Sequence, residues 1–455
     1  MLRLTWVQPE DLIGHELRQA HQDGRRPTAI EKRWQAAGGP EAPVRAGASP
    51  RPASRYLRQL AEDLLDELAD LPSWLRDKEP TGLERIRSLC PDWPSPPRAP
   101  RPPAGLESRL HAAWLGRAVG CLLGKPVEKL PLTGIRQLAQ AAGNWPLTAY
   151  FTARGVPGPL LGTYPWNRRS AGTSLAENID GMPEDDDLNY PLLNLLLLQR
   201  HAKDFTTTDV AGLWLDELPA GRAFTAERVA YRNLLSGVEP PHTARHRNPF
   251  REWIGALIRA DLHGWTNPGD PAGAAEQAYR DATLTHTANG VYAAMFTAAA
   301  IATAATGTAD VHTCLRTGLS VVPPHARLAE AVRHAVRLAA HHEDFATVVD
   351  ELHTRHAAYH WVHAIPNTAL IAAALTHADG DFSGTICRAV SGGWDTDSNG
   401  ATAGSIAALL AGSPAALPDR WTAPLKNRLA TSIADFDGTG FDTLAHLTHL
   451  EATRP

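Results

Sequence analysis

The sequence predicts an all-α protein with a helical extension at its N-terminus. Hydrophobic residues make up 43% of the 455 residues, which is enough apolar material for a large core. Long Ala- and Leu-rich segments are separated by turns that contain Gly, Pro, Asn and Asp. Runs of β-branched residues are few and do not alternate regularly with the helical segments. A parallel α/β sheet is therefore not expected.

Residues 1–90 predict an extension that is partly helical and has no evident chemistry. Leucines recur at steps of three or four residues between 57 and 71, which gives one apolar stripe along an amphipathic helix. Residues 24–55 are rich in Pro, Gly, Ala and Arg and predict little regular structure. The Pro-rich residues 91–105 predict an extended linker, because proline lacks the backbone donor that helices need.

Residues 106–455 predict one large helical domain, in which frequent Ala and Gly allow close helix packing. The best candidate for a membrane span is 291–305. It is too short to cross a bilayer and predicts a core helix instead. The predicted helical segments are 107–123, 191–202, 287–305, 325–342, 367–378 and 399–412.

Charge and cysteine content predict a soluble, cytoplasmic protein. The formal net charge is −5, which is not typical of a nucleic-acid-binding protein. The N-terminal residues are too charged for a signal peptide. We expect a monomer whose partners include neither nucleic acid nor membrane. The cysteines are too few and too far apart for a disulfide scaffold or a Cys-x-x-Cys site; they are Cys90, Cys121, Cys314 and Cys387.

Four consecutive carboxylates, Glu184 to Asp187, precede an apolar segment and form what we call the first acidic motif. One interpretation is that these residues only stabilise the N-terminal end of a helix, where each acidic side chain contributes about 0.3–1 kcal/mol. The run is unusually dense, and like charges this close repel unless a cation or a cationic partner offsets them. The motif is therefore also a candidate metal site.

A second acidic motif, Asp395, Asp397 and Ser398, follows Gly392 and Gly393, which permit a tight turn. Its carboxylate and hydroxyl oxygens favour a hard cation such as Mg²⁺, Ca²⁺ or Mn²⁺ over zinc. An Asx-turn or helix N-cap is the equal alternative. Brought face to face, the two acidic motifs would be able to hold two metal ions.

Glycines recur at four-residue steps on one face of the helix predicted at 107–123. Gly116, Gly120 and Gly124 allow another backbone to approach that face closely. The helix is expected to end before Pro126. Glu128 then lies just past the helix end, either as a pocket carboxylate or as an exposed loop residue.

Three motifs in this order, "GRAVGCLLGKPVE", "PEDDDLNY" and "GGWDTDSNGATAGS", resemble those of the ADP-ribosylglycohydrolases. Segments 284–302 and 363–375 are also similar to that family. The resemblance covers about residues 108–412. It implies a large all-α catalytic domain with two Mg²⁺ ions, or Mn²⁺, in a central cleft, and Glu128 as the catalytic residue. The metal ligands that it implies are Asp185, Asp186, Asp187, Asp395, Asp397 and Ser398.

The chain departs from the family pattern in two of the three motifs, the opening motif and the first acidic motif. Cys121 stands where the opening motif often has Asp, and the first acidic motif lacks the usual Thr. The register of that motif is open, because it starts either at Glu184 or at Asp185. These departures bear on the identity of the substrate more than on the fold.

Several residues beside the second acidic motif are candidates for binding substrate. Backbone amides near Gly392, Gly393 and Asn399 suit a diphosphate. Trp394 would stack on a substrate ring or serve as a core aromatic. His363 and Asn367 lie one helical turn apart in a family-like segment, and a hydrogen-bonded core histidine is the alternative at His363.

The resemblance implies a Mg²⁺-dependent hydrolase of the bond between ADP-ribose and an acceptor, with N-linked ADP-ribosyl-arginine on a protein as the first expectation. A small-molecule N-ribosyl or ADP-ribosyl compound is the second. A catalytically inactive module that binds ADP-ribose is the third, and the presence of Glu128 and both acidic motifs argues against it.

Overall fold

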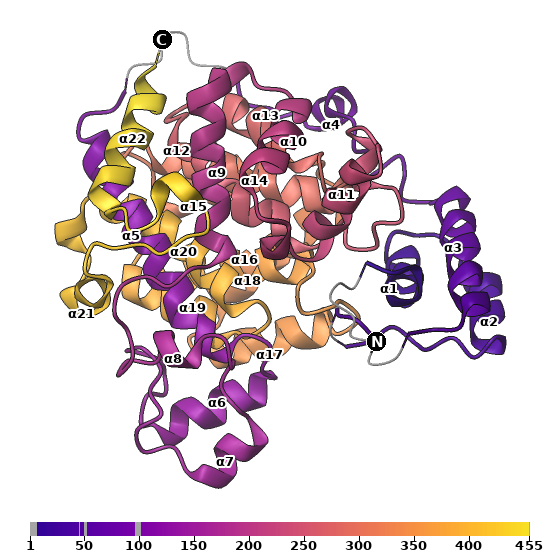
Figure 1. Ribbon diagram of the computed structural model, residues 1–455. Coiled ribbons are helices and arrows are strands. Elements are labelled where there is room, and N and C mark those ends of the chain that lie inside the picture. The colour runs from indigo at the N-terminus through magenta and orange to yellow at the C-terminus, as the bar shows by residue number, and fades with distance from the viewer. Residues whose placement is uncertain (1–6, 45, 50–51, 96–101, 455) are drawn as a thin grey trace.

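The structure, a computed structural model, describes residues 7–44, 46–49, 52–95 and 102–454. Within these residues the chain forms 22 α-helices, and the only β-type pairing is two isolated bridges (Figure 1). The predicted all-α fold is confirmed. The predicted proline-rich linker falls partly outside the described residues, since 96–101 are among those left out.

Four helices form the N-terminal extension: α1 (Pro9–Gln22), α2 (Thr28–Ala36), α3 (Arg55–Asp70) and α4 (Leu83–Leu89). The leucine stripe lies on α3, which begins after Ser54, whose side chain accepts a hydrogen bond from Leu57 N. The expectation of little regular structure over 24–55 was wrong for α2. Ile30 and Trp34, one turn apart, are buried in the core and stabilise this helix.

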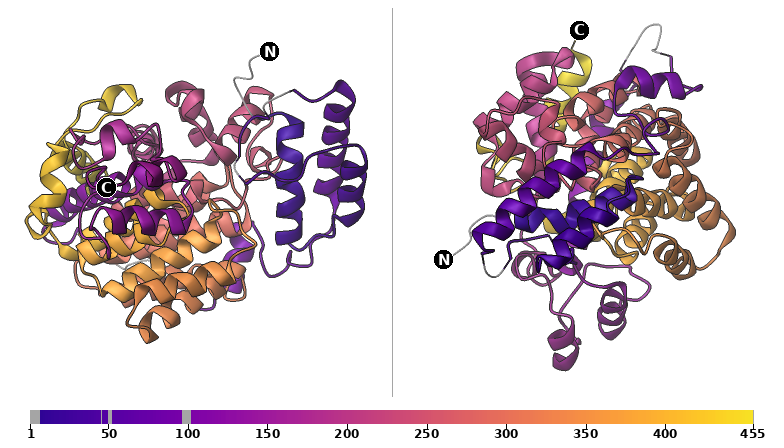
Figure 2. Two further views of the ribbon diagram at one scale, coloured as in Figure 1. Left: turned by 90° about the horizontal axis from the view of Figure 1, so that it is seen from below. Right: turned by 90° about the vertical axis from the view of Figure 1, so that its right-hand side faces the viewer.

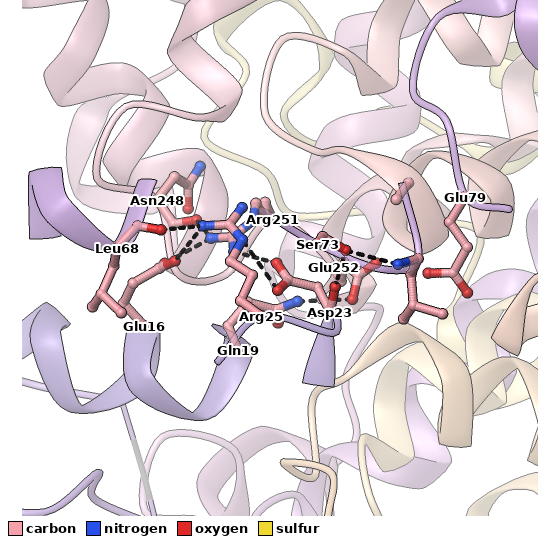
Figure 3. A network of polar contacts seen from close by, with 12 residues as sticks. Glu16, Gln19, Asp23, Arg25, Leu68, Ser73, Glu79, Asn248, Arg251 and Glu252 are labelled. Carbon is pink, nitrogen blue, oxygen red and sulfur yellow. Dashed lines mark hydrogen bonds and ion pairs between the residues drawn. The ribbon is translucent and has the colours of Figure 1, made fainter. Parts of the chain in front are cut away.

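Helices α1, α2 and α3 lie together at one edge of the molecule (Figures 1 and 2). Buried polar contacts hold α1 against the rest of the chain (Figure 3). Arg251 Nη1 lies 2.6 Å from Glu16 Oε2, and Arg251 Nη2 lies 2.6 Å from Asp23 Oδ2. Gln19 Nε2 donates a 2.8 Å hydrogen bond to Glu252 Oε2. The extension is therefore docked through charges that burial makes costly to separate.

The remaining helices build one large body. They are α5 (Leu106–Gly124), α6 (Leu132–Ala141), α7 (Gly158–Thr163), α8 (Ala171–Ser174), α9 (Asp186–His201), α10 (Thr207–Glu217), α11 (Thr225–Leu235), α12 (Asp261–Trp265), α13 (Pro271–Ala282), α14 (Ala288–Ala304), α15 (Val311–Ser320), α16 (Arg327–His341), α17 (Phe345–Arg355), α18 (Ala364–Ala378), α19 (Phe382–Ser391), α20 (Thr396–Ala411), α21 (Asp419–Thr422) and α22 (Phe441–Thr453). Short 3₁₀ helices connect them: η1 (Lys125–Val127), η2 (Ala202–Asp204), η3 (Ala220–Arg222), η4 (His242–Ala244), η5 (Ile254–Arg259), η6 (Pro414–Ala416), η7 (Ala423–Leu425) and η8 (Ala434–Phe436).

The core is built around helices that are apolar on all sides. Almost every residue of α14 is buried, as are nearly all residues of α18 and α20. Such helices need small side chains on some faces, which the Ala and Gly content provides. The prediction of a core helix at 291–305 is confirmed, and among the described residues no helix is long and apolar enough to cross a membrane.

Candidate active site

Glycines let α5 and α20 meet at their backbones. A Cβ atom placed on Gly120 would lie 1.9 Å from the carbonyl oxygen of Gly400, closer than real Cβ contacts allow. One turn further along α5, Thr396 Oγ1 donates a 2.8 Å hydrogen bond to Gly124 O. The two helices are therefore antiparallel, and the C-terminal end of α5 lies at the N-terminal end of α20.

This contact places Glu128, which follows α5 and η1, beside the second acidic motif. Carboxylate oxygens of Glu128, Asp395 and Asp397 lie within 4.8 Å of one another. Both oxygens of Glu128 are held: Asn167 Nδ2 donates a 2.7 Å hydrogen bond to Oε2, and Lys129 Nζ lies 2.6 Å from Oε1. The structure thus brings the predicted catalytic residue together with two predicted metal ligands.

The first acidic motif forms the start of α9. Asp185 caps this helix by accepting a 2.9 Å hydrogen bond from Asp187 N, and Asp186 and Asp187 lie in the first helical turn. The Glu184 carboxylate is engaged elsewhere, 2.7 Å from Arg222 Nη2. The register of the motif stays open, because Asp185 is also engaged, in an ion pair with Lys125. Arg222, which lies on η3 and is distant from both motifs along the chain, was not predicted from the sequence.

Direct contacts join the two acidic motifs. Ser398 Oγ donates a 3.3 Å hydrogen bond to Asp187 Oδ2. Arg117, a fully buried residue of α5, donates to the backbone oxygen of Asp187 at 2.6 Å and lies 3.1 Å from its Oδ1. Cys121 Sγ lies 3.9 Å from Asp187 Oδ2. The ends of α5, α9 and α20 therefore converge on one buried acidic site.

The turn before α20 has an unusual backbone. Gly393 and Trp394 both have positive φ angles, +76° and +57°, in the left-handed region that glycine adopts readily. His353, which the sequence analysis missed, holds this turn: its Nε2 lies 2.8 Å from Gly392 O, and its ring stacks on Trp394 with a 4.0 Å centroid distance. One face of the Trp394 ring is therefore covered by His353.

Asn367 and Asn399 lie behind the turn and are fully buried. Asn367 Oδ1 accepts hydrogen bonds from Asp395 N at 3.2 Å and from Asn399 Nδ2 at 2.7 Å. Asn367 Nδ2 donates to Trp361 O at 2.9 Å. The two asparagines thus position Asp395, while their contact with substrate stays a prediction.

His363 is also fully buried, but it contacts neither acidic motif. Its Nδ1 accepts a 3.2 Å hydrogen bond from Ile365 N at the start of α18, and its Nε2 lies 3.7 Å from Glu252 Oε2. Burial lowers the pKa of this imidazole, which favours its neutral form. His363 therefore packs beside the buried carboxylate of Glu252 rather than beside the acidic motifs.

Burial and mutual repulsion shift the titration of the acidic motifs. Burial, together with the charges of Glu128 and Asp185, raises the pKa of Asp397 to about 7. Burial and neighbouring carboxylates also raise the pKa of Asp186. Burial would raise the pKa of Asp185 too, but the Lys125 ammonium paired with it holds that pKa below its usual value. Burial and repulsion therefore disfavour the charged forms of Asp186 and Asp397 unless a cation offsets them.

The donor set fits a hard divalent cation. Its ligand atoms are carboxylate oxygens of Glu128, Asp395 and Asp397, with the hydroxyl of Ser398 close by. In the part of the chain that the structure describes, the Asp186 carboxylate has no hydrogen-bond or ion-pair partner. Oxygen donors of this kind suit Mg²⁺ or Mn²⁺.

Comparison with known proteins gives the family. Residues 102–453 match the sequence model of the ADP-ribosylglycohydrolase family. A solved structure described as an ADP-ribosylglycohydrolase-related protein complex matches at 20% identity and a TM-score of 0.48, over 77% of this chain and 98% of that chain. No curated protein matches the chain. Because the family model extends from before α5 into the last helix, the chain belongs to the ADP-ribosylglycohydrolase family and is a glycosidase that acts on ADP-ribosyl bonds.

Proposed function

We propose that this protein is a Mg²⁺-dependent hydrolase that cleaves the N-glycosidic bond between ADP-ribose and an arginine side chain of a protein. The observation that carries the proposal is the convergence of Glu128 with Asp395 and Asp397 where α5 meets α20. The arginine linkage is the first expectation from the resemblance of the three motifs to those of the ADP-ribosylglycohydrolases. We propose the cytoplasm as its location and a monomer as its working form.

In the proposed reaction, water adds across the bond between the anomeric carbon and the guanidine nitrogen. The hydroxyl goes to the anomeric carbon and the proton goes to the leaving nitrogen, through an oxocarbenium-like state. Glu128 would take the proton from water and return it to the leaving group. Asn167 and Lys129 fix the two oxygens of that carboxylate and so set the direction in which it accepts a proton.

The acidic motifs would hold Mg²⁺, with Mn²⁺ as the alternative ion. A bound ion would supply Lewis-acid chemistry and a template for the ribose hydroxyls. Asn367 and Asn399 keep Asp395 in its orientation, and Ser398 keeps the second motif against the first. The amides of Gly392 and Gly393 already donate hydrogen bonds to Arg388 O and Val390 O, so the expectation that they bind a diphosphate is wrong. We propose that Trp394 contacts the ADP-ribosyl group.

The test is release of free ADP-ribose, followed by chromatography, from arginine-linked protein, serine-linked protein and small-molecule ADP-ribosyl substrates. Each is tested with Mg²⁺ and then with chelator. We expect chelator-sensitive release from the arginine linkage. Release only from a small molecule would move the substrate to that class, and tight ADP-ribose binding without release from any substrate would indicate a binding module.

A matched pair of variants tests the role of Glu128. Glu128→Gln should lose turnover by about 10²-fold or more, because general acid–base catalysis contributes about 10²–10⁴-fold, while keeping its fold. Glu239→Gln makes the same change at an exposed residue and should keep full activity. Wild-type turnover in the Glu128 variant would remove this residue from the chemistry.

A further inference from the structure

A fixed cation already lies inside the first acidic motif. Lys125, the first residue of η1, is only 6% exposed although it carries a charge. Its Nζ is ion-paired with Asp185 Oδ2 and donates a 3.3 Å hydrogen bond to Glu184 O. Lys125 follows the glycine face of α5 directly, so its position is set by the same helix contact that builds the site.

The two groups of candidate ligands differ in chemistry. In one group, Glu128, Asp395 and Asp397 offer only oxygens, and the last two have no cationic side chain paired with them among the described residues. In the other group, Asp185 is paired with Lys125, and the third member beside Asp187 is the Cys121 thiol. A thiol is a poor ligand for a hard cation. The second group is therefore the weaker metal site.

The charge balance points in the same direction. Six carboxylates face the site, namely Glu128, Asp185, Asp186, Asp187, Asp395 and Asp397. Three of them are paired with fixed cations: Asp187 with Arg117, Asp185 with Lys125, and Glu128 with Lys129. Arg117 is shared with Asp261, whose Oδ2 lies 2.9 Å from its Nη1. The three carboxylates without a fixed cation are Asp186, Asp395 and Asp397, and two of them belong to the group that offers only oxygens.

We propose that this chain binds a single divalent ion, at Glu128, Asp395 and Asp397, and that the Lys125 ammonium takes the place of a second ion at the first acidic motif. Lys125 would then be a positioning residue that holds Asp185 and the start of α9 without metal. The inference departs from the expectation of two ions, and it rests on the proposed metal dependence.

The test is the number of ions per chain in the full-length protein, measured by native mass spectrometry after equilibration with Mn²⁺. Electron paramagnetic resonance of the same samples separates an isolated Mn²⁺ from a coupled pair. We expect one uncoupled ion in the wild type. Two ions would overturn the inference, and no ion would overturn the proposed metal dependence together with it.

A substitution tests the role of the ammonium directly. Lys125→Met keeps much of the side-chain volume and removes the charge, so we expect it to bind two ions. Lys78→Met makes the same change at an exposed residue and should still bind one. Circular dichroism checks that both variants fold. A folded Lys125 variant that still binds one ion would overturn the proposal, and if that variant does not fold, the wild-type count still decides it.

Discussion

The contact between α5 and α20 predicts that Gly120→Ala damages both the fold and the site. The added Cβ would lie 1.9 Å from Gly400 O, and its neighbours there are backbone atoms that cannot rotate away. Non-bonded carbon atoms pack at about 3.5–4.0 Å, so the helices would have to separate by about 1 Å or more. The separation would move Glu128 relative to Asp395 and Asp397.

The expected magnitudes follow from this overlap. Overpacking a dense core costs about 1–3 kcal/mol, which lowers the thermal midpoint by roughly 1–3 °C in a chain of this size. A misplacement of about 1 Å in a catalytic group can reduce turnover by about 10²-fold. The variant should therefore lose activity well before it loses its fold.

Thermal unfolding by far-ultraviolet circular dichroism and ADP-ribose release are the assays, with Gly212→Ala as the matched control. Gly212 lies inside α10, where a Cβ atom would meet nothing within 4 Å. Alanine favours a helix over glycine by about 1 kcal/mol, so the control should be at least as stable as the wild type. If Gly120→Ala kept the wild-type midpoint and turnover, the two helices would not meet at these glycines.

Three further predictions follow from the contacts around the site and the N-terminal extension. Asn367→Ala leaves buried donors unpaired at a cost of about 1–3 kcal/mol and should weaken Mg²⁺ binding about tenfold by calorimetry; unchanged affinity would show that α20 holds the turn alone. Mg²⁺ affinity should fall as the pH drops below about 7, because the raised pKa of Asp397 means that the ion must displace a proton there, and a flat pH profile would contradict this. Arg251→Ala leaves the carboxylates of Glu16 and Asp23 with only the longer ion pairs to Arg25, at 3.6 and 3.3 Å, and should cost up to about 3–5 kcal/mol of stability. Arg87→Ala breaks an exposed pair worth at most about 1 kcal/mol, and similar melting of these two arginine variants would argue against a buried docking contact.

The helices of the catalytic domain could be predicted because each one is indicated by a short stretch of sequence, such as an apolar run or a proline that ends a helix. The run at 287–305 is long and apolar, and α14 occupies Ala288–Ala304. The segment at 107–123 became α5, which ends at Gly124 before Pro126 as expected. Helix α2 was missed because its stability depends on burying Ile30 and Trp34 against other elements, which the composition of 24–55 does not show.

The residue types of the site could also be predicted locally. Two dense acidic motifs, a glycine period and a glutamate past a helix end are visible in short windows, and their chemistry follows from their side chains. His353 and Asn167 were not predictable in this way. Each is an isolated residue whose partner lies 39 positions away along the chain, so no window holds both partners.

The sequence by itself therefore determined the helical architecture of this protein and the carboxylates that carry its chemistry. Tertiary structure alone decided which carboxylates face one another and which already have a cation. Ser398 meets Asp187 across 211 positions, and Lys125 meets Asp185 across 60. Such pairings arise only when α5, α9 and α20 pack together, because the electrostatic balance of a buried site depends on distance in space rather than along the chain.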